Sequence, residues 1–145
     1  MSKPLSPEVI AIVKRTAPIM QQHGLAITTR MYDRLFTDPK MKALFDNAGS
    51  APGEQPKRLA AAILAYAQNV DNLSALHGAI ERVAKRHVAA HIAPEHYGPV
   101  ADALLPAIKD ILGDAVDASI LEAWKEAYWF LAEVLQNREK AIARP

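Results

Sequence analysis

The sequence predicts an all-α protein of six or seven helices, and three observations support this fold class. Apolar residues recur at intervals of three and four positions through nearly the whole chain, which is the spacing of one face of an α-helix. No run of alternating β-branched residues indicates a strand. The ten prolines and six glycines fall mostly between the periodic segments, as expected of residues that end helices. We therefore expect one helical domain over residues 1–145.

The N-terminal part is expected to hold two long helices and a short one. Ser6-Pro7-Glu8 suits a helix start, because it offers an N-cap hydroxyl, a proline at the first helical position and a carboxylate in the first turn. Pro18 predicts a kink, and His23-Gly24 separates this helix from the next. The following segments are a helix over 25–36, a helical turn over 38–45 and a loop over 46–53.

The C-terminal part is expected to hold four long helices. The first covers about 54–70, and the next carries His87 and ends before Pro94. Pro94 opens a helix with Glu95 in its first turn, and this helix has the cleanest amphipathic pattern of the chain. Gly113-Asp114 ends it, and the last helix covers about 117–142.

Composition and charge exclude several classes of protein. The 17 basic and 16 acidic residues leave a net charge of +1, so there is no basic footprint for nucleic acid. The absence of cysteine excludes disulfides and thiolate chemistry and fits a reducing compartment. No signal peptide and no apolar run of about 20 residues is present, so we expect a cytoplasmic protein without a membrane span.

Five polar residues break the apolar stripes of the expected helices. His87 is the clearest case, because it completes the stripe of Ile80, Val83 and Ala84, where an inward-facing imidazole needs a partner. Taken singly, each of the five also fits an ordinary role, such as a buried tyrosine with a local hydrogen bond or a core histidine without a ligand. The five residues are Tyr32, Gln55, His87, Tyr97 and Glu139.

Together these residues predict a polar pocket that could hold a metal through His87. A metal-binding histidine needs an acceptor for its other ring nitrogen, and Glu139 can accept while Tyr97 positions the pair. Tyr32 and Gln55 would face a polar ligand from the opposite side. A zinc site of His87 and His91 has the right spacing on a helix, but it lacks a third ligand and the glutamate of the metalloprotease motif.

Five segments resemble the globin domain of bacterial flavohaemoglobins and the related single-domain bacterial haemoglobins. The segments occur in matching order and cover essentially the whole chain. They are HGLAITTRMY ending at Tyr32, ALF ending at Phe45, GEQPKRLAAAILAYAQNVDNL over 53–73, HVAAHIAPEHY over 87–97 and AWKEAYWFLAEVLQNRE ending at Glu139.

The resemblance implies a globin fold of six to seven helices around a haem pocket, with haem b (iron protoporphyrin IX) as cofactor. His87 matches the histidine that ligates the iron, and Tyr97 and Glu139 match the hydrogen-bonding residues behind it. On the distal side, opposite the histidine, Tyr32 matches the tyrosine that donates to dioxygen, and Gln55 matches its glutamine neighbour. Two further matches are Phe45, which packs on the haem face, and Leu59, which lines the distal pocket.

The resemblance also implies a function in dioxygen chemistry. A carboxylate behind the histidine makes the imidazole more electron-donating, which favours dioxygen activation over storage. The implied reaction is oxidation of nitric oxide to nitrate, with electrons from a separate flavin reductase. Dioxygen delivery to a respiratory partner and gas sensing are the alternatives. The implied partners are dioxygen, nitric oxide and carbon monoxide as ligands, the reductase, and a second copy of the chain in a homodimer.

Two features depart from the family pattern. The sequence ends at Pro145 without a fingerprint for FAD or NAD, so we expect either a separate reductase or that the sequence is one domain of a longer protein. Trp129 follows Tyr128 where related chains often have a small residue, and the sequence does not tell what its bulk does to the pocket.

Overall fold

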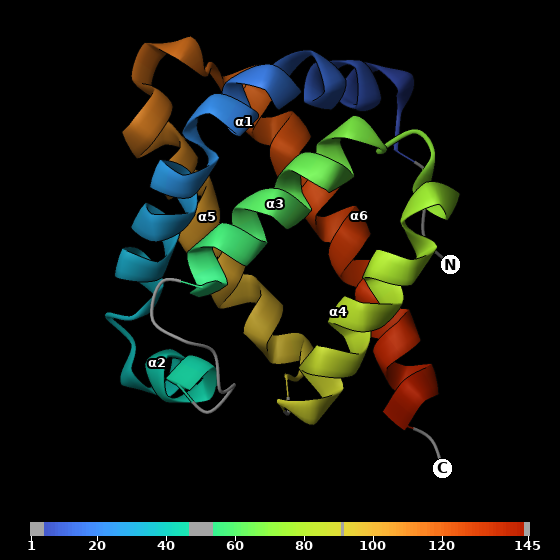
Figure 1. The fold of residues 1–145 in the computed structure, drawn as a ribbon. Helices are drawn as coiled ribbons and strands as arrows, with labels where there is room; N and C mark the ends of the chain where they lie inside the picture. The colour runs from blue at the N-terminus through green and yellow to red at the C-terminus, as the bar shows by residue number, and fades with distance from the viewer. Residues whose placement is uncertain (1–4, 47–53, 91, 144–145) are drawn as a thin grey trace.

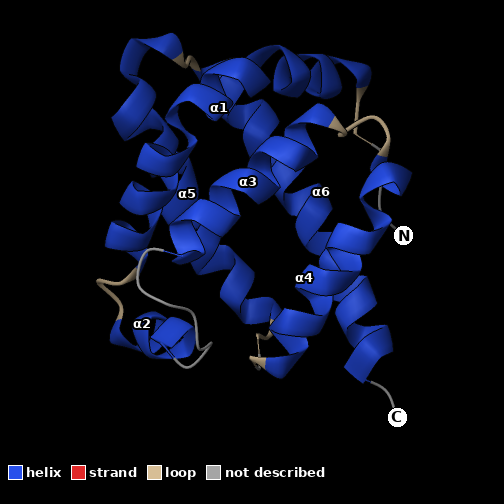
Figure 2. Ribbon diagram, in the orientation of Figure 1, coloured by secondary structure: helices blue, strands red, loops and turns tan. Residues whose placement is uncertain are grey.

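The computed structural model describes residues 5–46, 54–90 and 92–143, and within these ranges every regular element is a helix (Figure 1, Figure 2). The α-helices are α1 (Pro7–Leu35), α2 (Pro39–Asp46), α3 (Glu54–Gln68), α4 (His77–Ala89), α5 (Tyr97–Leu112) and α6 (Ala118–Ala143). Short turns of 3-10 helix join them, at η1 (Leu73–Leu76), η2 (Pro94–His96) and η3 (Gly113–Ala115). The all-α prediction is confirmed. No described helix has the length and apolar character needed to cross a membrane.

The N-terminal helix differs from the prediction, because the two expected helices form one continuous element. Pro18 lies inside α1, and Gly24 does not end it. Figure 1 shows that α1 runs along the top of the view and then turns down its left side. Gly24 faces α3: a Cβ atom there would lie 3.4 Å from the Cβ of Ala60, an ordinary van der Waals contact. The glycine therefore marks a helix contact, where the sequence suggested a break.

Helix ends follow the expected capping chemistry. The Ser6 hydroxyl accepts a hydrogen bond from the Val9 amide at 3.2 Å, and the Asp117 carboxylate accepts one from the Ile120 amide at 2.9 Å. These bonds satisfy amides that the first turn of a helix leaves unpaired. Gly113 ends α5 with a φ of 54°, a left-handed conformation that favours glycine.

The helices pack in two groups. Helix α1 packs against α3, α5 and α6, whereas α4 packs mainly against α6 (Figure 1). The buried side chains follow this division, with a large cluster between α1, α3, α5 and the first half of α6. A smaller cluster consists of Ala84, Tyr97, Ala132 and Leu135. Helix α6 contributes to both clusters and thus connects α4 to the rest of the molecule.

Polar contacts fix the larger group. The Asp110 carboxylate on α5 binds two arginines of α1, with Oδ2 2.9 Å from Nε of Arg30 and 2.6 Å from Nη2 of Arg34. In the core, the indole N–H of Trp124 donates to the Thr16 hydroxyl at 2.9 Å. Helix α1 is therefore held to both α5 and α6 by side-chain bonds in addition to apolar burial.

Candidate functional site

The structure brings His87, Tyr97 and Glu139 together from three helices, as the sequence predicts. His87 lies near the end of α4, Tyr97 begins α5, and Glu139 lies in the last turns of α6. His87 Nδ1 is 2.9 Å from Glu139 Oε2 and 3.0 Å from the Tyr97 hydroxyl oxygen. Tyr97 in turn donates to the same Glu139 oxygen at 2.6 Å. The three side chains therefore form a closed triangle of hydrogen-bond contacts.

The triangle determines which nitrogen of His87 carries a proton. An ionised carboxylate only accepts hydrogen bonds, and Tyr97 gives its single proton to Glu139. The hydrogen bond between His87 and Glu139 therefore uses a proton on Nδ1 of His87. Nε2 then has a free lone pair, the form of imidazole that binds a metal. Among the described residues, no group hydrogen-bonds Nε2.

The three residues of this site differ in their exposure to solvent. Glu139 is 8% exposed and Tyr97 is 6% exposed, whereas the His87 side chain is 30% exposed. Burial, together with the hydrogen bond to Glu139 and its negative charge, raises the pKa of Tyr97 far above the ordinary value for tyrosine. The hydroxyl therefore stays protonated and remains a donor to Glu139. The Nδ1 side of the imidazole is thus bonded to buried groups, whereas part of the ring remains exposed.

Tyr128 extends the site in a way that the sequence analysis missed. Its hydroxyl on α6 donates to the main-chain oxygen of Tyr97 at 2.6 Å. Tyr128 and Glu139 are eleven residues apart, which is three helical turns, so they share one face of α6. Helix α6 thus holds Tyr97 at both its main chain and its side chain. The spacing of eleven was the available signal for this second contact.

Several aliphatic side chains on the inward stripes of α3, α4, α5 and α6 are only half-buried. They come from four helices and border the two buried clusters, with Tyr128 and Leu131 adjoining both. A wall of inward aliphatic residues that keep part of their surface exposed fits a bound apolar group. The half-buried aliphatic residues include Leu59, Ile63, Val83, Val100 and Leu131.

Comparison with known proteins decides the family. Residues 29–135 match the globin family, which is more than half of the chain. The chain belongs to the globin family. A flavohemoprotein from Xylella fastidiosa is 51% identical over 142 residues, which cover 98% of this globin and 36% of that relative. The globin thus spans about a third of the length of the flavohemoprotein.

Solved structures agree with this assignment. An engineered carbene transferase from Rhodothermus marinus, also described as a candidate nitric oxide dioxygenase, has a TM-score of 0.89 and 39% identity, covering 95% of each chain. A flavohemoglobin from Malassezia yamatoensis, solved with bound FAD and heme, has a TM-score of 0.83 and 30% identity. The match covers 97% of this globin and 38% of that protein. The predicted globin fold is therefore confirmed.

The residues predicted for the opposite side of the pocket are only partly described. Tyr32 is buried on α1 in the large cluster, with its ring centroid 5.3 Å from that of Phe36, and burial raises its pKa to about 12. Leu59 on α3 packs against the same cluster. The side chains of Gln55 and Phe45 lie outside the described part of the structure.

Two further sequence hypotheses concern residues near this region. His91, the second member of the zinc alternative, lies outside the described residues. Trp129 is described and does not fill the pocket: it is 40% exposed, with its ring edge-on to Tyr128 at a centroid distance of 5.2 Å. Its bulk therefore lies at the surface of α6.

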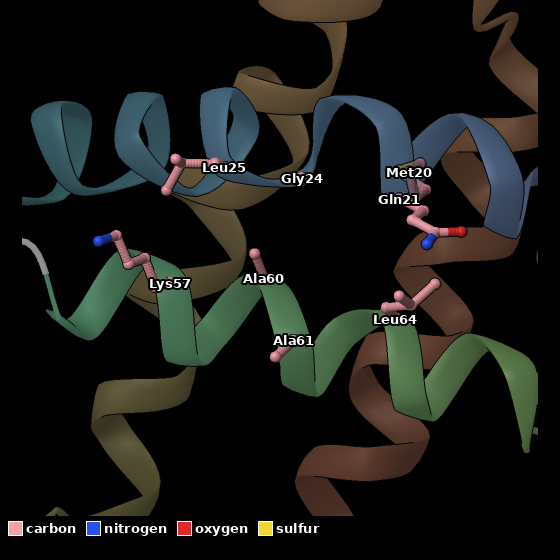
Figure 3. Close-up of a pocket in the computed structure, with 8 residues that line it drawn as sticks. All are labelled: Met20, Gln21, Gly24, Leu25, Lys57, Ala60, Ala61 and Leu64. Carbon is pink, nitrogen blue, oxygen red and sulfur yellow. The ribbon is translucent and has the colours of Figure 1, made fainter.

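A hollow of about 250 Å³ lies elsewhere, between α1 and α3 (Figure 3). Figure 3 shows Lys57 at one end, Gln21, Met20 and Leu64 toward the other, and small residues between them. None of the predicted site residues lines this hollow. It is therefore separate from the His87 site. Its full lining is Met20, Gln21, Gly24, Leu25, Lys57, Ala60, Ala61 and Leu64.

Proposed function

We propose that this globin binds haem b through His87 and oxidises nitric oxide to nitrate with dioxygen, using electrons from a separate reductase. The observation that carries the proposal is the contact of Nδ1 with Glu139 and Tyr97, which leaves Nε2 of His87 free to ligate iron. The flavohemoglobin that aligns with 97% of the chain is described with bound heme, which supports the choice of cofactor. The candidate nitric oxide dioxygenase with a TM-score of 0.89 supports the reaction.

The residues of the site fit haem in both chemistry and shape. Haem is a flat, mainly apolar group that takes one imidazole from the proximal side. His87 offers an imidazole whose Nδ1 is held by Glu139, and Leu59, Val83 and Leu131 offer half-buried aliphatic surface. When bound, the haem would supply an iron that binds dioxygen and exchanges electrons.

The proximal residues of the chain would set the electronic character of the imidazole. The Glu139 carboxylate draws the Nδ1 proton toward itself, which increases electron density on Nε2. Tyr97 holds the carboxylate in place by donating to the same oxygen. A strongly donating ligand favours dioxygen activation over reversible storage, so this geometry supports a dioxygenase role more than a carrier role.

The distal residues are assigned by family resemblance. Tyr32 would donate its hydroxyl proton to dioxygen, and its raised pKa keeps that proton in place at neutral pH. Gln55, Phe45 and Leu59 would complete the distal wall. Dioxygen delivery to a respiratory partner is the competing role, and it requires fast dioxygen release.

The first experiment is an absorption spectrum of the purified protein with added haem, in ferric, dithionite-reduced and carbon monoxide forms. We expect a Soret band that sharpens and shifts with carbon monoxide in the wild type. His87→Ala should weaken or abolish the band, and added imidazole should restore it. His77→Ala serves as the control, because His77 is exposed at the start of the same helix. Haem bands that are unchanged in His87→Ala would refute the assignment of the ligand.

A second experiment separates the two roles. The dioxygen-loaded protein is mixed with nitric oxide, and nitrate is measured. Stoichiometric nitrate together with slow dioxygen release supports the dioxygenase. Fast release with little nitrate would instead support dioxygen delivery.

A further inference from the structure

One aromatic side chain of the site region is not explained by the proposed function. Trp129 is a large apolar residue that stays 40% exposed on α6. Its ring meets Tyr128 edge-on, with a centroid distance of 5.2 Å and an interplanar angle of 88°. This is a favourable aromatic contact, but an exposed tryptophan contributes little to the core. Its position beside Tyr128 makes the indole accessible from solvent while it contacts a residue of the site region.

Tyr128 connects this surface residue to the interior. Its hydroxyl donates to the main-chain oxygen of Tyr97 at 2.6 Å. The Tyr97 hydroxyl oxygen lies 3.0 Å from His87 Nδ1, and the two rings meet edge-on with centroids 6.0 Å apart. Trp129, Tyr128, Tyr97 and His87 thus form a connected series from the surface to the candidate iron ligand, in which the covalent path through Tyr97 joins its main-chain oxygen to its ring. We call these four residues the aromatic relay.

The other tryptophan of the chain has a different environment. Trp124 is 4% exposed, and its indole N–H donates to the Thr16 hydroxyl in the core. Trp129 has no protein hydrogen bond among the described residues, so its indole N–H can exchange its proton with solvent. Of the two indoles, only that of Trp129 combines solvent access with a connection to His87.

We propose that the aromatic relay passes electrons from a donor at Trp129 to a haem held by His87 after hydrogen peroxide has oxidised it. The proposal rests on haem binding by His87 and adds a second activity, a peroxidase reaction at the protein surface. Indole and phenol rings are the side chains that lose an electron most readily, and a series of short contacts divides one long transfer into several short ones. The donor is any one-electron reductant that reaches the exposed indole.

The electron and proton balance is simple. Reduction of one hydrogen peroxide to two water molecules takes two electrons and two protons. Each electron leaves the indole of Trp129, and the proton of its ring nitrogen passes to solvent. A surface donor, such as a phenol or a reduced haem protein, returns the electron, and solvent returns the proton. Two electron transfers through the relay therefore reduce one hydrogen peroxide and oxidise two donor molecules.

The test begins with haem-loaded protein whose carbon monoxide spectrum is normal. Hydrogen peroxide is added with a nitroso spin trap, and adducts are located by electron paramagnetic resonance and peptide mass spectrometry. We expect an adduct on Trp129 in the wild type and its loss in Trp129→Phe. Trp129→Tyr should restore a radical at this position, because phenol can also be oxidised.

A second measurement uses reduced cytochrome c, which is too large to enter the pocket. Its peroxide-dependent oxidation should fall several-fold in Trp129→Phe and in Tyr128→Phe. Tyr66→Phe is the matched control, because Tyr66 also donates to a main-chain oxygen of α6, that of Ala127 at 2.8 Å, but lies outside the relay. This control should retain the wild-type rate.

The outcomes separate this inference from the proposed function. A normal haem spectrum without an adduct on Trp129, or with an unchanged rate in Trp129→Phe, overturns the relay and leaves haem binding intact. Failure to form any haem spectrum overturns both proposals. An adduct that appears only on Tyr97 would show that the radical stays on Tyr97 and does not reach Trp129 at the surface. This result would also contradict the relay.

Discussion

Replacement of Glu139 by glutamine is the sharpest test of the proximal site. The change keeps the size of the side chain and an oxygen that can accept hydrogen bonds, but it removes the negative charge. Glu139 Oε2 accepts from His87 Nδ1 at 2.9 Å and from Tyr97 at 2.6 Å, so both contacts lose charge assistance. We expect weaker haem binding and a less donating imidazole.

The magnitude follows from these two bonds. A hydrogen bond to a charged group contributes about 1.5–3 kcal/mol and a neutral one about half as much, so each bond loses roughly 1 kcal/mol. Two bonds give about 2 kcal/mol, which corresponds to roughly 30-fold in an equilibrium constant. This agrees with the loss of about 10- to 100-fold in metal affinity that follows removal of residues supporting a metal ligand.

Two measurements check this prediction. Transfer of haem to an excess of an apoglobin acceptor should be roughly 30-fold faster in Glu139→Gln. The Fe–His stretching frequency of the reduced protein should fall, because the imidazole donates less charge. Glu126→Gln is the control, since Glu126 is exposed on the same helix. An unchanged frequency together with unchanged haem transfer would show that the carboxylate does not act on His87.

Three other substitutions test the remaining contacts. Tyr32→Phe should speed dioxygen release roughly tenfold, the equivalent of one hydrogen bond, as followed by stopped-flow displacement with carbon monoxide; an unchanged rate would remove Tyr32 from the distal role. Asp110→Asn should reduce the loss of unfolding free energy that occurs as the pH is lowered. The α1 arginines lower the folded-state pKa of Asp110, so its contribution is present above the unfolded pKa of about 3.9 and is lost as pH falls through the folded value. Urea midpoints that fall equally with pH in both proteins would contradict this. Trp124→Phe should cost about 1–3 kcal/mol of unfolding free energy in a urea titration, because the Thr16 hydroxyl loses its indole donor; no change would mean that this bond is not formed in solution.

The fold could be predicted from the sequence wherever one signal dominates. Apolar periodicity and capping residues place both ends of α6 and the C-terminal end of α5 within about one residue, including the stop at Gly113 and the start after Asp117. The start of α5 lies three residues later than expected, because Pro94–His96 form a 3-10 turn. The break expected at His23-Gly24 was wrong. A glycine inside a helical pattern can mark either a chain break or a close helix contact, and the sequence does not show that Ala60 approaches Gly24.

The candidate site was predicted from polar residues at positions where the helical periodicity calls for apolar ones. His87, Tyr97 and Glu139 could be selected for this reason, and the structure places them in contact. The sequence analysis gave Tyr128 no role in the site, because a tyrosine on an apolar stripe gives no sign that its hydroxyl reaches the main chain of another helix. The outward direction of Trp129 was equally hidden, since it depends on where α6 contacts its neighbours.

Helix α6 is the element that links these observations. Tyr128 and Glu139 stand about 16 Å apart along its axis on one face, and both contact Tyr97, one through the main chain and the other through the side chain. Any rotation of α6 against α5 would disturb both contacts together, so the position of the Glu139 carboxylate behind His87 is coupled to the position of Tyr128. Trp129 is bonded directly to Tyr128 and moves with it. The same helix that supplies charge to the imidazole therefore also sets the end of the aromatic relay at the surface. A change on the outer face of α6 can consequently reach the candidate iron ligand without any contact with the pocket.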